Sequence, residues 1–301
     1  MVHYTACPIC SSDKISILFD CTDHFVTGET FPVARCNECG FSFTQDRPEE
    51  SEAGKYYESD SYISHSDTSR GLINKLYRFA RNMMLRKKAK LVKRLTKLEK
   101  GSILDIGSGT GYFASEMKKA GWDAKGIEIN EKARDFSISS FGLEISAPSQ
   151  IGKLISRSFD CITLWHVLEH SDDPDAYMTE IRRLLKPGGT CIIALPNSNS
   201  YDALHYGRYW AAWDVPRHLW HFTPSTFHRF AENAGFSLTG LRSLPLDVFY
   251  ISALSEKYKG SKLNFIIGMI RGKWWWLMTL LNKERTSSLI YIVKASPPLI
   301  F

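Results

Sequence analysis

Two CxxC pairs near the beginning of the chain could bind a metal ion. Cys7 and Cys10 form the first pair, Cys36 and Cys39 form the second, and 25 residues separate the pairs. Each pair can present two thiolates on one tight turn, and two such turns complete a tetrahedral zinc site. Because four thiolates leave no open coordination position, an ion bound there would be structural. The pattern predicts a small zinc ribbon over residues 1–45.

The remaining cysteines fit other roles. The total of seven is odd, which argues against a complete disulfide framework. Cys21 and His24 form a third possible ligand pair, but ordinary residues of the ribbon are the favoured interpretation. Cys161 and Cys191 lie in apolar runs and are most simply buried side chains of core strands.

A glycine-rich turn follows a short apolar run at residues 103–111, which read ILDIGSGTG. The apolar run predicts a buried strand ending at Asp105, and the glycines allow a tight turn and close approach of a ligand to the backbone. The dinucleotide fingerprint GxGxxG needs a glycine where this chain has Tyr112. A carboxylate at the strand end disfavours a pyrophosphate and favours a ligand with an amino group. Glu128 ends the next strand, where such folds hold a ribose diol.

Strands and helices alternate from residue 101 onward. Six apolar runs predict strands, and they are separated by stretches with helical periodicity and helix-capping signals. This alternation predicts an α/β fold with a mostly parallel sheet that helices cover on both faces. The predicted strands cover 102–106, 124–129, 159–164, 191–195, 236–244 and 288–293, and the helices between them include 113–120, 174–185 and 223–235.

Several motifs in this order resemble class I S-adenosylmethionine-dependent methyltransferases. They are the LDIGSGTG stretch with Glu128, then SFDCITL at 158–164, HVLEH at 166–170 and LLKPGG at 184–189. The resemblance covers roughly residues 75–245 and implies a Rossmann-like sheet of seven strands. We therefore expect a zinc ribbon over 1–45, a linker and basic amphipathic helices over 46–100, and a methyltransferase domain over 101–301. Segments 198–222 and 245–287 are expected to cover the acceptor.

The resemblance also implies which residues hold the cofactor. Asp105 and the loop would hold the methionine end of S-adenosylmethionine, Glu128 the ribose hydroxyls, and Ile129 would pack beside the adenine. Residues 147–150 contain no acid, whereas family members often use one there for the adenine amino group. The expected cofactor-binding residues are Asp105, Gly107, Ser108, Gly109, Gly111, Tyr112, Glu128, Ile129, Trp165 and His166.

Two histidines are candidates for acid–base catalysis. A ribbon ahead of this core resembles deoxysugar C-methyltransferases, in which a Glu-His pair follows the fifth strand. Here His218 takes the base position and Arg217 replaces the glutamate. His170, next to Glu169, lies in a loop that also resembles ubiquinone-pathway O-methyltransferases, where acidic residues and a histidine can hold a divalent cation. The alternative to a catalytic role for His170 is that it caps a helix. The nearby His221 could simply pack beside Trp220, and Arg217 could form a salt bridge with Asp214 instead of binding an acceptor.

The expected function is methylation of a small molecule, with a sugar, quinol-like or lipid-linked acceptor and transfer to oxygen or carbon. The main alternative is an RNA methyltransferase, because residues 70–100 carry a net charge of +11 within a chain of +6. The helical spacing of the apolar residues in that segment favours an outer helix face over a nucleic-acid patch. A scaffold that binds cofactor without turnover is a further alternative.

The tryptophans at 274–276 lie beside Arg271 and Lys273 and could form an interfacial anchor, a lid or a dimer contact. No uncharged apolar stretch of 18 residues is present, so we expect no transmembrane helix. Charged residues and cysteines near the N-terminus argue against a signal peptide, and a cytoplasmic protein is expected. Peripheral membrane contact and the oligomeric state stay open.

Overall fold

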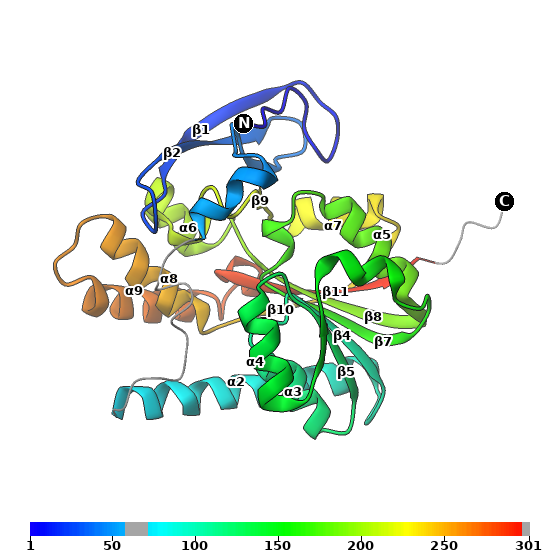
Figure 1. Cartoon of the computed structure of the whole chain (residues 1–301). Helices are drawn as coiled ribbons and strands as arrows, with labels where there is room; N and C mark the ends of the chain where they lie inside the picture. The colour runs from blue at the N-terminus through cyan, green and yellow to red at the C-terminus, as the bar shows by residue number, and fades with distance from the viewer. Residues whose placement is uncertain (58–71, 297–301) are drawn as a thin grey trace.

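The computed structural model describes residues 1–57 and 72–296, which form two sheets (Figure 1). The larger sheet has the strand order β10-β11-β8-β7-β4-β5-β6. Strands β4 to β8 are parallel, and β11 runs antiparallel to both β8 and β10. The seven-stranded α/β prediction is therefore confirmed. The strands are β4 (Ser102–Ile106), β5 (Asp123–Ile127), β6 (Glu144–Ser146), β7 (Phe159–Trp165), β8 (Leu185–Pro196), β10 (Phe236–Ser243) and β11 (Ser288–Ala295).

Helices cover both faces of this sheet, and each face has its own hydrophobic core. On one face α5 (Pro174–Leu184) and α7 (Pro224–Asn233) pack against residues such as Leu104 and Ile162. On the other face α2 (Leu72–Thr96) and α3 (Tyr112–Lys119) pack against their strand neighbours, such as Ile103 and Cys161. This alternation follows from the period of two along a strand. Helix α4 (Glu131–Phe141) lies beside α3.

Where one or two basic amphipathic helices were expected, the described part of the segment forms one, α2. One strand boundary needs adjustment. Strand β8 begins at Leu185, six residues before the expected start, because Leu185 pairs with Phe159 and Thr190 pairs with Cys161. The Pro187–Gly189 turn is therefore a bulge inside the strand, with Gly188 at φ +79°.

The N-terminal residues form a smaller antiparallel sheet that includes a strand from far along the chain. Its order is β1 (Ile15–Thr22), β2 (Thr30–Cys36), β3 (Ser42–Thr44) and β9 (Trp220–His221). Strand β9 comes from the 198–222 segment, and Phe43 pairs with Trp220. Phe41 and Phe43 share one buried core with Phe222 and Phe227 on the α5–α7 side. The ribbon region is thus joined to the larger sheet by both pairing and packing.

The two segments expected to cover the acceptor are mostly helical. The first contains α6 (Tyr201–Tyr206) and short 3-10 turns at Gly207–Tyr209 and Ala211–Trp213. The second contains α8 (Asp247–Tyr258), α9 (Asn264–Met278) and a turn at Lys283–Arg285. Further 3-10 turns are Glu50–Tyr56, Pro148–Lys153 and Leu168–His170. Among the helices of the described ranges, none has the length and apolar character to cross a membrane.

Candidate active site

The glycine loop connects β4 to α3 at the carboxyl edge of the parallel strands. Gly107, Gly109 and Gly111 have φ values of +70°, +53° and +74°, a region that side chains rarely adopt. A Cβ at Gly107 would lie 2.3 Å from Val167, so the loop packs tightly there. At Gly109 a Cβ would meet no atom within 4 Å of the described structure, which leaves its outer side free for a ligand.

Asp105 at the end of β4 is buried and accepts a hydrogen bond of 2.6 Å from the Thr163 hydroxyl. Burial raises the pKa of Asp105 to about 7, although Thr163 and the nearby Lys88 ammonium favour the charged form. A cationic group bound beside this carboxyl would favour its ionised form. The position therefore suits a ligand that carries an amino group.

Glu128 and Ile129 lie at the end of β5, across the loop. The Glu128 carboxylate accepts backbone N–H bonds from Gly109 (2.7 Å) and Asn130 (2.8 Å), which fix its orientation. Each oxygen keeps a further lone pair for a hydroxyl donor. The Ile129 side chain is 78% exposed and offers an apolar surface to a ring. The Ser108 hydroxyl is buried and has no partner among the described residues, so the loop also holds an unsatisfied polar atom.

Two of the expected cofactor residues have other contacts. The Tyr112 ring packs against Phe136 and Phe141 of α4, and the Arg81 guanidinium lies 3.8 Å from its centre. Trp165 at the end of β7 packs edge-on against Phe113 and stacks with Lys88. A role of either side chain in binding a cofactor stays a prediction.

His166 lies between two carboxylates just after β7. Its Nδ1 is 3.2 Å from Glu169 and its Nε2 is 3.3 Å from Asp247 at the start of α8. Burial disfavours the charged ring, but Asp247 and Glu169 outweigh it and raise the pKa of His166 to about 9. The charged histidine therefore ties α8 to the loop after β7 at neutral pH. Sequence reasoning missed Asp247, which no local motif marks.

The structure brings both candidate catalytic histidines together. Glu169, His170 and His218 each offer an atom within 4.8 Å of the others, and the two imidazole rings meet edge to face at 4.5 Å. His170 Nδ1 lies 3.0 Å from the Arg217 carbonyl, and His218 Nδ1 lies 2.9 Å from the Ala212 carbonyl. Since a carbonyl can only accept, both rings donate through Nδ1. Their Nε2 atoms can then accept a proton or bind a cation.

Burial and the neighbouring His218 lower the pKa of His170 to about 4. His170 is therefore neutral under ordinary conditions. Glu169 is fully buried, and its Oε2 has no hydrogen-bond partner within the described residues. The Leu219 N–H donates to the Glu169 carbonyl at 2.7 Å and fastens the two loops together.

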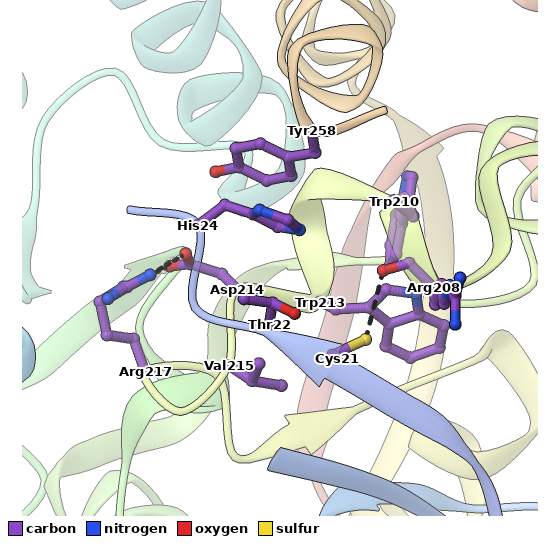
Figure 2. Close-up of a pocket in the computed structure, with 10 residues that line it drawn as sticks. All are labelled: Cys21, Thr22, His24, Arg208, Trp210, Trp213, Asp214, Val215, Arg217 and Tyr258. Atoms are coloured by element: carbon purple, nitrogen blue, oxygen red, sulfur yellow. Dashed lines mark hydrogen bonds and ion pairs between the residues drawn. The ribbon is translucent and has the colours of Figure 1, made fainter. Parts of the chain in front are cut away.

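Arg217 lies beside Asp214 at the junction with the ribbon region (Figure 2). Its guanidinium is 2% exposed, 2.6 Å from Asp214 and 2.9 Å from Asp23, and it donates to the Tyr56 carbonyl. Two carboxylates therefore neutralise the Arg217 guanidinium. The salt bridge to Asp214 is observed. Sequence reasoning missed Asp23, which lies 194 residues away along the chain.

The aromatic residues before His218 seal this junction. Tyr206, Trp210 and Trp213 are buried in one cluster with Cys21 and Phe31 of the ribbon region. The cavity that Cys21, Trp210 and Trp213 help to line, shown in Figure 2, has a volume of about 10 Å³. That space holds about one water molecule. The cluster therefore acts as a core cover, and its rings offer no acceptor pocket there.

The four paired cysteines converge as their spacing predicted. Cys7 Sγ lies 3.5 Å from Cys39 Sγ, Cys10 Sγ lies 3.5 Å from Cys36 Sγ, and all four sulfurs are within 4.8 Å of one another. Burial opposes ionisation of Cys36, but N–H groups of Cys39 and Glu38 and neighbouring thiols lower its pKa to about 7. This donor set fits a tetrahedral zinc ion.

Other candidate ligands lie elsewhere. Cys21 donates to the Arg208 carbonyl, and His24 stacks on Tyr258, so neither belongs to the four-cysteine cluster. His221 is buried, with its Nε2 3.0 Å from the Thr44 hydroxyl. Burial and His218 hold the pKa of His221 well below its usual range. It therefore packs in the strand pair β3–β9, as the simpler interpretation expected.

A methyltransferase domain family model matches residues 78–241. The chain belongs to this methyltransferase family. It is similar to the ubiquinone biosynthesis O-methyltransferase of Cupriavidus pinatubonensis (27% identity over 164 residues, 49% of this chain and 66% of that protein). It is also similar to the protein of that name from Thiobacillus denitrificans (30% over 166 residues, 49% of this chain and 71% of that protein). The matched region thus spans about two thirds of these relatives.

A crystal structure described as a candidate sarcosine dimethylglycine methyltransferase from Galdieria sulphuraria shares the fold. Its TM-score is 0.50 at 16% identity, and the match covers 74% of this chain and 88% of that one. Family and fold together confirm the class expected from the sequence. The methyltransferase is S-adenosylmethionine-dependent.

Proposed function

We propose that this methyltransferase transfers a methyl group to a ring hydroxyl of a small quinol-like molecule, with His218 as the general base. The names of its relatives, ubiquinone biosynthesis O-methyltransferases, support an oxygen acceptor. The observation that carries the proposal is the His218 ring. Its Nδ1 is engaged by the Ala212 carbonyl and its Nε2 is left to accept a proton at the carboxyl edge of the sheet.

In this proposal, Asp105, the Gly107–Gly111 loop and Glu128 hold S-adenosylmethionine, with Ile129 beside the adenine and His166 near the methyl group. The cofactor supplies an electrophilic methyl group on its sulfonium. The residues fit it, because Asp105 suits an amino group and the open side of Gly109 allows close approach. Glu128 has lone pairs for ribose hydroxyls.

The remaining task is to remove the acceptor's proton. Methyl transfer is an in-line displacement, so the hydroxyl oxygen attacks as its proton passes to a nearby base. A histidine whose Nε2 is free accepts that proton near neutral pH. Asp214 Oδ2 lies 3.9 Å from His218 Nε2, and Glu169 lies in the same cluster, so two carboxylates stabilise the imidazolium that forms.

The test is turnover of a panel of catechols, hydroquinones and sugars by His218→Ala. A general base typically contributes about 10²–10⁴-fold, so kcat should fall by that factor while cofactor affinity stays within about twofold. His228→Ala is the matched control, because His228 is exposed on α7 and pairs only with Glu232 among the described residues. Equal loss in both variants, or wild-type kcat in His218→Ala, would refute the role of His218.

The same assay separates the alternatives. A strict requirement for added Mg²⁺ or Mn²⁺ that His218→Ala or Glu169→Gln abolishes would assign the cluster to a divalent cation instead. Label transferred to total RNA but not to the small-molecule panel would favour the RNA methyltransferase. Cofactor binding without turnover on any acceptor would favour a scaffold.

We further propose that Cys7, Cys10, Cys36 and Cys39 bind one structural zinc ion. Convergence of the four sulfurs supports this. Metal analysis should find one zinc per chain, and Cys36→Ser should lose it while Cys21→Ser keeps it. Chelation should unfold residues 1–45 and leave cofactor binding intact, because metal binding and folding of such modules are coupled. Purified protein without zinc and with freely reactive thiols would contradict the proposal.

A further inference from the structure

Helix α9 has its apolar residues on the outside. Leu263, Ile266, Ile270, Trp274 and Leu277 recur at helical spacing of three and four residues, and each is at least 42% exposed. Beyond the end of the helix, Leu281 is 81% exposed. Such a stripe normally faces a protein core. Here the exposed fractions show that the stripe faces outward. Helices α8 and α9 lie next to each other at one side of the molecule (Figure 1).

The inner side of α9 is small and polar instead. Gly268 and Gly272 lie against α8, where an added Cβ at Gly268 would be 2.3 Å from the Ala253 Cα. Arg271 forms an ion pair of 2.7 Å with the buried Glu256 of α8. The two helices therefore pack closely through glycines, a mode that suits helices whose outer faces are in lipid. The orientation of α9 is fixed by α8, so the apolar stripe cannot turn inward.

A basic groove borders this face. It has a volume of about 1210 Å³ and lies between α2, the end of β10 and α9. Seven lysines and arginines line it against one acid, Glu284. Lys273 and Trp276 of α9 belong to the lining, so the groove and the apolar stripe lie on the same helix. The basic residues include Lys87, Lys90, Arg94, Arg242, Lys273 and Lys283.

We propose that the outer face of α9 and the adjoining basic groove dock on an anionic phospholipid bilayer. The apolar stripe enters the boundary between headgroups and acyl chains while the groove attracts lipid phosphates. At 15 residues α9 spans only about 22 Å, so it lies in the plane of the bilayer rather than across it. The proposal goes beyond the methyl-transfer reaction and does not depend on which acceptor is used.

The charges on this face favour an anionic bilayer as its partner over a second copy of the chain or a nucleic acid. A second copy of a chain with net charge +6 would bring two sets of groove lysines together, and that repulsion opposes a symmetric contact. A nucleic acid would satisfy the groove but would leave the six outward apolar side chains in water. An anionic bilayer satisfies both surfaces at once.

The test is co-sedimentation of the purified chain with phosphatidylcholine vesicles that contain or lack phosphatidylglycerol. The wild type should sediment with the anionic vesicles and release as salt rises. Ile270→Ser combined with Trp274→Ser should weaken binding at least tenfold, since each change removes a large apolar side chain from the interface. Lys273→Glu combined with Lys283→Glu should weaken it by at least about fivefold per residue.

The matched control substitutions lie at residues 132–155, outside α9 and outside the residues that line the basic groove. Ile138→Ser with Ile155→Ser also removes two exposed large apolar side chains, and Lys132→Glu with Lys153→Glu also reverses two exposed charges. All variants should keep wild-type cofactor affinity, which reports folding. The proposal is overturned if the wild type ignores anionic vesicles or if the controls lose binding equally. It is also overturned if the α9 variant instead dissociates a dimer, or if only RNA is retained.

Discussion

In the proposed cofactor half of the site, Asp105, the glycine loop and Glu128 lie within one short stretch of chain, residues 105–128. The proposed acceptor half instead combines Glu169 and His170 after β7 with the loop at 214–218, which Asp23 of the ribbon region holds through its ion pair with Arg217. The first half is positioned by two neighbouring parallel strands. The second depends on docking between segments almost 200 residues apart, so it should respond to damage in the ribbon while the cofactor half does not.

The largest effect is expected from breaking the junction with Arg217→Met. This change leaves the buried Asp23 and Asp214 carboxylates without their cation, which typically costs about 3–5 kcal/mol of unfolding free energy. Turnover should fall with stability, while calorimetry at a permissive temperature should show cofactor affinity close to wild type. Arg208→Met, at an exposed arginine of the same region, is the control. Cofactor affinity that falls in step with turnover would remove the distinction between the two halves.

The converse change is Asp105→Asn in the cofactor half. It keeps an acceptor for the Thr163 hydroxyl but removes the charge that suits an amino group. Affinity for S-adenosylmethionine should fall at least about 100-fold, roughly 2.7 kcal/mol, with little change in thermal stability. Asp123→Asn, at the exposed start of β5, serves as the control. Wild-type affinity measured by calorimetry in Asp105→Asn would place the cofactor elsewhere.

The pH dependence of cofactor binding gives a smaller effect. Burial raises the pKa of Asp105 to about 7, and binding of a cation requires the carboxylate. Below pH 7 affinity should therefore weaken by up to about tenfold per pH unit, and above pH 7 it should level off. Asp105→Asn should abolish this slope. A flat profile in the wild type between pH 6 and 8, about one unit either side of the pKa, would show that Asp105 does not titrate on binding.

The smallest effect is expected from Asp247→Asn, which removes one of the two carboxylates beside His166. The pKa of His166 is raised to about 9, so this pairing stabilises the fold fully below the ordinary histidine pKa of about 6.5. That contribution is lost as pH rises through about 9. In Asp247→Asn the pKa of His166 should fall, and the loss of stability should be complete at a lower pH than in the wild type. Titration of the His166 imidazole by NMR measures its pKa, and thermal melts between about pH 6.5 and pH 9 measure the loss of stability.

Whether the sequence could predict a residue's role depends on how far along the chain its partners lie. The glycine loop, Glu128 and the cysteine pairs could be predicted because their chemistry is written within a few consecutive residues. Asp23, Asp247 and Thr163 could not, because each is an ordinary residue type whose partner comes from another element. The burial of Trp210 and Trp213 against the ribbon region could not be predicted either, since the sequence does not show what covers an aromatic side chain.

The sequence by itself determined the alternation of strands and helices, with six of the seven strands of the larger sheet, the glycine turn between β4 and α3 and the pairing of four cysteines. These follow from hydrophobic period, glycine conformation and ligand spacing, which act over short stretches. Only the tertiary structure decided that β9 completes the ribbon's sheet, that Arg217 faces Asp23 rather than an acceptor, and that α9 presents its apolar side outward. Each of these features depends on which surfaces meet in the folded chain. The packing of the α9 glycines against α8 and the burial of the Arg217–Asp23 pair arise from contacts that no local sequence pattern specifies.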